Sequence, residues 1–117
     1  MKLQSVILLL SLVSISFTFN PTQLINTSLT VTVRDEVGNT VEGASIKLFE
    51  TEDNYNQEKN TLAEGTTDAK GVFRFKKIKA MAYFVLVKKG DKDNMGGGEK
   101  IGKLEDGKFN KVTIVIQ

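Results

Sequence analysis

The residues of this chain that could contact a ligand lie in a polar segment near its middle. Asp53, Asn54, Tyr55 and Asn56 are consecutive within residues 50 to 62, a stretch with no apolar period. We predict an exposed loop here, because the segment is polar and lacks an apolar period. Loops longer than about twelve residues are often functional. An exposed aromatic ring can stack on a sugar or anchor a protein partner, and the neighbouring polar groups can bond hydroxyls. The segment is the predicted contact site, with a solvated insertion as the alternative.

If Tyr55 has no role in the core, its removal should weaken binding and leave stability almost unchanged. Surface substitutions usually change the free energy of unfolding by no more than about 0.5 kcal/mol. Phe49 and Tyr83 are the other aromatic residues weighed for sugar stacking, and Tyr83 is expected in the core because it begins an apolar run.

A second segment, from Asp91 to Glu99, gathers carboxylate and amide oxygens around three consecutive glycines. Such oxygens could hold calcium, but the EF-hand count fails, because Met95 stands at its fifth position and Gly102 at its twelfth. An ordinary polar hairpin loop is the favoured interpretation. Loops at one end of a β-sandwich can form a common rim, so this segment and the one around Tyr55 are predicted to lie together.

Composition excludes most enzymatic chemistry. The 117 residues include no histidine and no cysteine, with 16 Lys+Arg against 14 Asp+Glu and a formal net charge of +2. Without imidazole or thiol groups, the common nucleophilic triads and nearly every catalytic zinc site are ruled out. We predict no catalytic residue, cofactor or metal, and no nucleic-acid partner, because the charge is nearly balanced. Acid–base chemistry by carboxylates stays open, but no pair is singled out.

The first residues have the profile of a secretory signal peptide. Lys2 precedes an apolar stretch from Val6 to Phe19, which is short of the roughly twenty residues that a bilayer span needs. Small residues flank Ile15, as a signal peptidase requires. We predict a signal peptide over 1–19, a polar tether over 20–27 and one domain over 28–117. Export to the periplasm or the medium follows, with no membrane span after cleavage; an uncleaved anchor is the alternative.

The domain has the period of β-strands. Apolar residues alternate with polar ones over 29–34, 44–48 and 72–76, and the run 83–87 is apolar on both faces, which is typical of a covered central strand. Shorter strands are expected over 63–67, 100–104 and 112–116. Asp68 to Gly71 should form a tight turn with Gly71 in the left-handed region. We predict an all-β fold: an antiparallel β-sandwich of about seven strands, in which the first two runs are neighbours.

Three segments together resemble a known family. They are Leu29 to Leu48, the Gly65 to Phe75 segment with its Thr-Asp-x-x-Gly-x-Phe-x-Phe pattern, and Tyr83 to Gly90. This pattern resembles the carboxypeptidase regulatory-like domains, which have the prealbumin (transthyretin-like) Greek-key fold. The resemblance implies turn glycines at 38, 43 and 71 and a core built from Val33, Ile46, Phe73, Phe75 and Val85. Starch-binding-like sandwiches share this shape, so the resemblance also allows carbohydrate binding.

Two chemically active relatives can be tested on these residues. Hydroxyisourate hydrolases of the transthyretin type use histidines and a C-terminal Tyr-Arg-Gly-Ser, both of which are missing here. Modules similar to Cna protein B-type domains join a first-strand Lys to a last-strand Asn, and the predicted strands 29–34 and 112–116 contain neither. The sequence thus predicts a non-enzymatic binding or scaffold module of a bacterial envelope, with an envelope protein or glycan as partner. The alternative is a carbohydrate-binding module with a starch-binding-like fold.

Processing is the first testable expectation. Export should remove the residues before about Phe17 to Gln23, because the apolar stretch is too short to remain as a span. Intact-mass measurement on protein recovered from the native envelope decides this. A membrane-bound form that retains residues 1–16 would show that the segment is an anchor.

Overall fold

The computed structural model describes residues 25–117, and the predicted signal peptide, with most of the tether, lies outside them. Within this range the chain forms strands and one short helix. In order they are β1 (Ser28–Asp35), β2 (Ser45–Phe49), α2 (Glu52–Gln57), β3 (Ala63–Thr66), β4 (Val72–Phe75), β5 (Tyr83–Lys89), β6 (Lys92–Asp93), β7 (Lys100–Ile101) and β8 (Phe109–Ile116).

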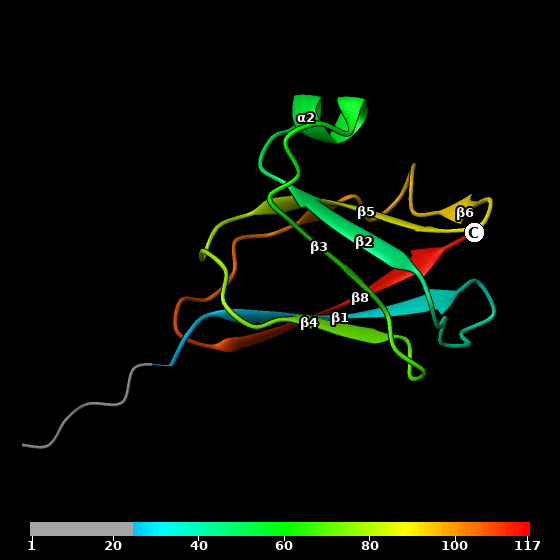
Figure 1. Ribbon diagram of the computed structural model, residues 1–117, viewed down its shortest axis with the longest axis horizontal. Helices are drawn as coiled ribbons and strands as arrows, with labels where there is room; N and C mark the ends of the chain where they lie inside the picture. The colour runs from blue at the N-terminus through cyan, green and yellow to red at the C-terminus, as the bar shows by residue number, and fades with distance from the viewer. Residues whose placement is uncertain (1–24) are drawn as a thin grey trace, which may run out of the picture.

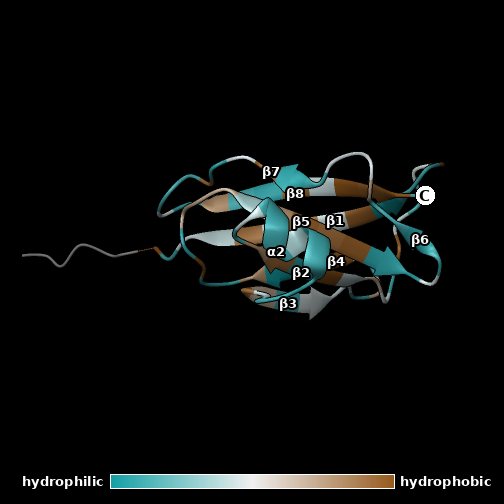
Figure 2. Cartoon of the chain, turned by 90° about the horizontal axis from the view of Figure 1, so that it is seen from above, coloured by the Kyte–Doolittle hydropathy of each residue, from teal (hydrophilic) through white to brown (hydrophobic). Residues whose placement is uncertain are grey.

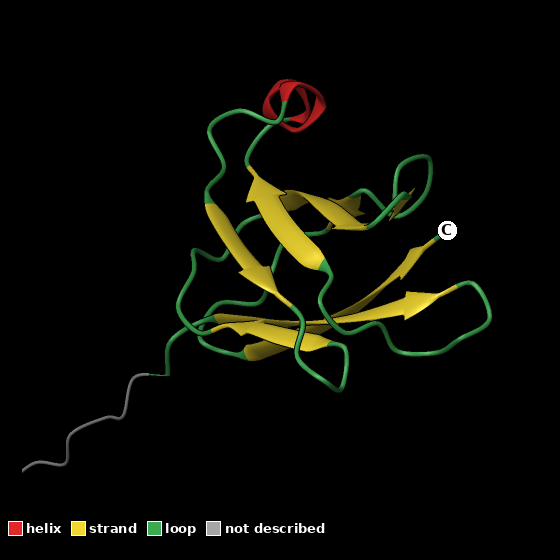
Figure 3. Ribbon diagram, turned by 45° about the vertical axis from the view of Figure 1, so that its right-hand side comes forward, coloured by secondary structure: helices red, strands yellow, loops and turns green. Residues whose placement is uncertain are grey.

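The strands form two packed sheets, so the predicted all-β sandwich is confirmed (Figures 1 and 3). One sheet has the order β4-β1-β8. The other has the order β3-β2-β5-β6, with β7 on the same edge of β5 as β6. Figure 1 shows three layers: α2 above, the sheet containing β2 and β5 in the middle, and the sheet containing β1 below.

Two details of the predicted topology are wrong. The first and last strands, β1 and β8, pair in parallel over their whole length, whereas every other strand pair is antiparallel. In addition, β1 and β2 belong to opposite sheets, and an isolated bridge pairs Arg34 of β1 with Thr40 in the connection that leads to β2. Alternation of apolar residues decides which face of a strand is buried, but it carries no information about strand direction or partner.

The core lies between the sheets and is built from the inward positions of both. Leu29, Val31 and Val33 on β1 are fully buried, and they face Ile46 and Val85 from the other sheet. Fully burying one such side chain contributes about 1.5 to 3 kcal/mol, so the inward positions of these strands stabilise the fold strongly. Phe75 and Tyr83 are also buried and Phe73 packs against the cluster, as predicted.

The two connections that cross between the sheets at one end are hydrogen-bonded to each other. The buried Thr67 donates its hydroxyl to the Val41 carbonyl at 2.7 Å and accepts the Ala44 amide at 2.8 Å. The Thr67 amide bonds the Ala44 carbonyl, and the Gly43 amide bonds the Thr67 carbonyl. Val33 holds the same two connections, because its amide bonds the Gly71 carbonyl at 2.8 Å and its carbonyl accepts the Val41 amide at 2.9 Å.

Both connections contain an Asp-x-x-Gly turn of the same construction. The Asp68 carboxylate accepts the amides of Lys70 and Val72 at 2.9 and 3.0 Å, and Gly71 lies at φ +76°. The Asp35 carboxylate accepts the amides of Asn39 and Val37 at 2.9 and 3.1 Å. These backbone donors stabilise the ionised carboxylates, so the pKa of each aspartate lies below its ordinary value. The predicted turn at Gly71 is thus confirmed, and both acids have structural roles.

Gly71 should tolerate no side chain, for two separate reasons. A Cβ there would lie 2.8 Å from the Thr40 Cβ and 2.9 Å from the Val41 amide nitrogen, and φ is positive. Gly90 also has a positive φ of +63°, but its Cβ direction is open. We therefore expect Gly71→Ala to lower the free energy of unfolding by about 2 to 4 kcal/mol, and Gly90→Ala by about 1 to 2 kcal/mol. Denaturant titration measures both, and equal losses would mean that the crossing connections do not touch at Gly71.

Candidate binding face

The predicted contact segment is a helix over much of its length, so the expectation of a loop is wrong there. Thr51 caps α2 by accepting the Asn54 amide at 3.1 Å, and Glu52 and Asp53 occupy the first turn, where negative charge favours a helix. Glu58 ends it in the left-handed conformation at φ +51°. These capping signals are legible in the sequence, but a single apolar residue in the helix shows no period.

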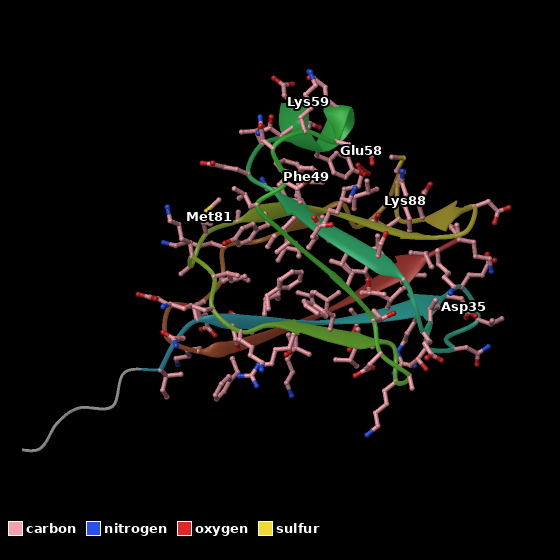
Figure 4. The ribbon with its side chains drawn as sticks, viewed as in Figure 1. Asp35, Phe49, Glu58, Lys59, Met81 and Lys88 are labelled. Atoms are coloured by element: carbon pink, nitrogen blue, oxygen red, sulfur yellow. The ribbon has the colours of Figure 1, made fainter. Side chains whose placement is uncertain are left out.

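Tyr55 is buried, with 4% of its surface exposed, which corrects the expectation that it has no core role. Its ring packs edge-on to Phe49 with centroids 6.0 Å apart and lies 6.1 Å from the ring of Phe84. With Leu86 these residues form a second, smaller core between α2 and the outer face of β2 and β5. Figure 2 shows α2 lying over β2 and β5, and Figure 4 labels Phe49 between the helix and the sheet. The helix therefore covers the outer face of β5, which explains why this strand is apolar on both faces.

Burial sets the ionisation of this tyrosine. Desolvation raises the pKa of Tyr55, and the negative charges of Glu99, Asp93 and Glu58 raise it further. Its hydroxyl has no hydrogen-bond partner among the described residues. At the helix end, the Glu58 carboxylate pairs with the Lys88 ammonium at 3.2 Å (Figure 4). Exposed ion pairs of this kind contribute about 0 to 1 kcal/mol to stability.

The other predicted contact residues do not converge on a ligand. Asp53 and Asn56 are exposed and Asn54 is half-buried, and the Asn54 side-chain oxygen accepts a hydrogen bond from the side-chain amide of Asn60 at 3.3 Å. Consecutive helix residues point in different directions around the axis, so these four residues cannot share one bound group. Their role as a contact site stays a prediction, and this geometry gives it no support.

The Asp91 to Glu99 segment protects the edge of β5. Between β6 and β7, the buried Asn94 side chain accepts a hydrogen bond from the Val87 amide at 2.8 Å and donates one to the Val85 carbonyl at 2.9 Å. It thus bonds backbone groups of β5 that a neighbouring strand would otherwise bond. The carboxylates of Asp93 and Glu99 accept amides of their own loop. Within residues 25–117, no group of three or more His, Cys, Asp or Glu side chains could hold a metal ion. Calcium binding by this loop therefore has no support from the structure.

The two outer sheet faces differ in how they are covered. Helix α2 packs on β2 and β5, whereas within the described part of the chain no helix or strand lies over the outside of β4, β1 and β8 (Figures 1 and 3). We call this uncovered surface the open face. Alternation and register assign to it Thr30, Thr32, Val72, Arg74, Phe109, Lys111, Thr113 and Val115.

The open face combines an aromatic ring, cations and hydroxyls. Phe109 is 62% exposed, and the Arg74 guanidinium lies 5.1 Å from its ring centroid, in a cation–π contact. In the strand register, Thr30 stands between Arg74 and Lys111, and these four residues line a shallow depression. Such a surface can stack on a planar group, donate hydrogen bonds and pair with negative charge.

A cleft of about 290 Å³ is the competing candidate. It opens at the end of the molecule near Met81, and its lining includes Glu50, Lys77, Lys79 and Tyr83 (Figure 4). The Tyr83 hydroxyl donates to the Lys79 carbonyl at 2.7 Å, so it is already occupied. Burial raises the pKa of this tyrosine, so the group is not poised to transfer a proton near neutral pH. The cleft mixes one acid with two lysines and has no convergent polar set.

In comparison with known proteins, neither a protein-family model nor a curated protein matches the chain. The helical structure of residues 25–117 lacks the length and apolar character that a membrane crossing requires.

Sequence reasoning missed the open face, although the alternation of Thr30, Thr32 and Arg34 along one strand was visible. What it lacked was the pairing that adds Arg74 and Phe109 to the same surface.

The buried position of Tyr55 leads to a stability prediction. Tyr55→Ala should lower the free energy of unfolding by about 2 to 4 kcal/mol, because it removes the ring that joins α2 to the sheet. Tyr55→Phe should leave stability unchanged or slightly higher, since the hydroxyl is buried without a partner. Thermal and denaturant unfolding measure both variants. Asn56→Ala, at an exposed position of the same helix, is the control, and a loss for Tyr55→Ala no larger than for this control would show that the ring is not packed.

Proposed function

We propose that this chain is an exported, non-enzymatic binding module of a bacterial envelope, and that it contacts its ligand through the open face. The observation that carries the proposal is the contrast between the two sheets. Helix α2 and its aromatic cluster cover the outer face of the sheet that contains β2 and β5, whereas the open face presents Phe109 and Arg74 to solvent. Aromatic residues and arginine are enriched where proteins bind partners.

We propose a non-enzymatic role because four of the acids hold backbone amides of turns and loops. Asp35 and Asp68 each hold two backbone amides of a turn, and Asp93 and Glu99 each hold one. A general acid or base needs a proton that it can exchange with a substrate near its operating pH. The lowered pKa values of Asp35 and Asp68 make them poor candidates for that work.

Family membership is part of the proposal. Gly38, Gly43 and Gly71 all have positive φ angles, which the resemblance to carboxypeptidase regulatory-like domains requires of its turn glycines. Of the expected core residues, Val33, Ile46 and Val85 are fully buried. These positions support a prealbumin-like fold, and export is supported by the apolar N-terminal stretch with its small residues. A fold of this kind carries no activity by itself, so the ligand has to be argued from the open face.

The proposal is tested by sedimentation with insoluble cell envelopes of the producing bacterium. We expect the purified chain to sediment with them, and Phe109→Ala to reduce the bound fraction about tenfold, because an aromatic anchor contributes about 1 to 2 kcal/mol or more to binding. Val37→Ala is the matched control, since it truncates another exposed apolar residue, on a turn away from the open face.

Both variants should unfold at the wild-type midpoint, because both side chains are exposed. Equal loss of binding in the two variants, or no binding by the wild type, would refute the proposed role of the open face.

A further inference from the structure

The charges on the open face all have one sign. Its outward positions include Arg74 and Lys111 but no aspartate or glutamate, although the chain as a whole is almost neutral. Arg34 lies on the same strand face, with its guanidinium bonded to the Gly38 carbonyl at 2.7 Å. Within residues 25–117 the only ion pair joins Glu58 and Lys88, so Arg74 and Lys111 have no carboxylate partner there.

The spacing of these cations suits a repeating anion. Thr30 is the direct register partner of both Arg74 on β4 and Lys111 on β8. Adjacent strands lie about 4.8 Å apart, which places the backbones of the two cations about 10 Å apart on either side of a hydroxyl. That distance is comparable with the length of a disaccharide, so charges that repeat along a sugar chain can meet both cations.

The remaining groups of the face suit sugar rings. Phe109 offers an exposed ring at one end, and Arg74 is held beside it by the cation–π contact. Thr30, Thr32 and Thr113 supply hydroxyls on neighbouring strands, since Thr32 is the partner of Thr113 in the register. The depression that Thr30, Arg74, Phe109 and Lys111 line is shallow and open to solvent. A flat surface of this kind fits an extended polymer.

We propose that the ligand of the open face is an anionic polysaccharide, with carboxylate or sulfate groups paired to Arg74 and Lys111 and a sugar ring stacked on Phe109. This inference rests on the proposed binding function and adds the chemistry of the ligand. Guanidinium and ammonium groups form their strongest hydrogen bonds with such oxyanions. Exposed charges also make the binding sensitive to salt.

The test measures binding of the purified full chain to soluble polymers by calorimetry. The probes are polygalacturonate for carboxylates, dextran sulfate for sulfates, unmodified dextran and soluble starch as neutral chains, and single-stranded oligothymidylate as a non-sugar polyanion. We expect binding to one or both anionic polysaccharides. It should be at least tenfold weaker for the neutral chains and for oligothymidylate, and about tenfold weaker again when salt rises from 50 to 500 mM.

Substitutions at Thr30 separate charge from shape. Thr30→Glu places a carboxylate between Arg74 and Lys111 and should abolish binding, whereas Thr30→Gln has nearly the same size and should bind within about threefold of the wild type. Lys100→Ala is the control for Arg74→Ala, because Lys100 makes the equivalent contact with Phe84, at 5.8 Å, on the helix-covered sheet. Arg74→Ala should weaken binding about tenfold, and Lys100→Ala should not change it.

Four results would overturn the inference: equal binding of neutral and anionic polysaccharides, tighter binding of oligothymidylate than of any polysaccharide, equal loss in both Thr30 variants, or no binding of any polymer. Sedimentation with envelopes that depends on Phe109, together with any of these results, leaves the proposed function standing and removes only the anionic glycan. Loss of both the sedimentation and the polymer binding removes both.

Discussion

Two of the connections that cross between the sheets, from β1 to β2 and from β3 to β4, run side by side, and their mutual hydrogen bonds hold the sandwich together at one end. Thr67 is central to this pairing, because its buried hydroxyl and both of its backbone groups are bonded to the connection from Val41 to Ala44. A buried polar group that loses its partner costs about 1 to 3 kcal/mol, so each of these bonds strongly favours the observed arrangement. The Asp-x-x-Gly turns set the path of both connections, and Gly71 allows them to approach closely.

This arrangement decides which strands become neighbours. Because the chain leaves β1 through one crossing and returns to β4 through the other, β1 gains β4 on one side and keeps its other side for β8. The last strand then lies parallel to the first. The open face is a product of this topology, since its residues come from three strands that are distant in sequence.

Helix α2 determines which outer sheet face is exposed. Without α2, both outer sheet faces would present apolar groups to solvent, and Phe49, Phe84 and Leu86 would form an exposed patch. Tyr55 closes that patch with little more than one side chain. The open face needs no such cover, because threonines and cations dominate its surface and leave Phe109 and Val115 as its most exposed apolar side chains. Cover on one side and exposure on the other therefore follow from the composition of the two faces.

The sequence by itself determined the all-β class, most of the strands, the turn at Gly71 and the inward residues of the core. These depend on alternation and on turn chemistry, which act between residues close in the chain. It also restricted the chemistry, because no imidazole or thiol is present. Capping rules could have predicted the helix from the sequence. The role of its one apolar residue, Tyr55, depends on contacts with Phe49 and Phe84, which only the fold brings close to it.

Only the tertiary structure decided the candidate site. Tyr55 has the same sequence surroundings whether its segment is an exposed loop or a helix packed on the sheet, and its burial follows from contacts with β2 and β5. Arg74, Phe109 and Thr30 acquire a common surface through the pairing of β1 with β4 and β8, and no local pattern specifies that pairing. The physical reason is that strand pairing is stabilised by contacts between distant residues, whereas sequence patterns report the preferences of near ones.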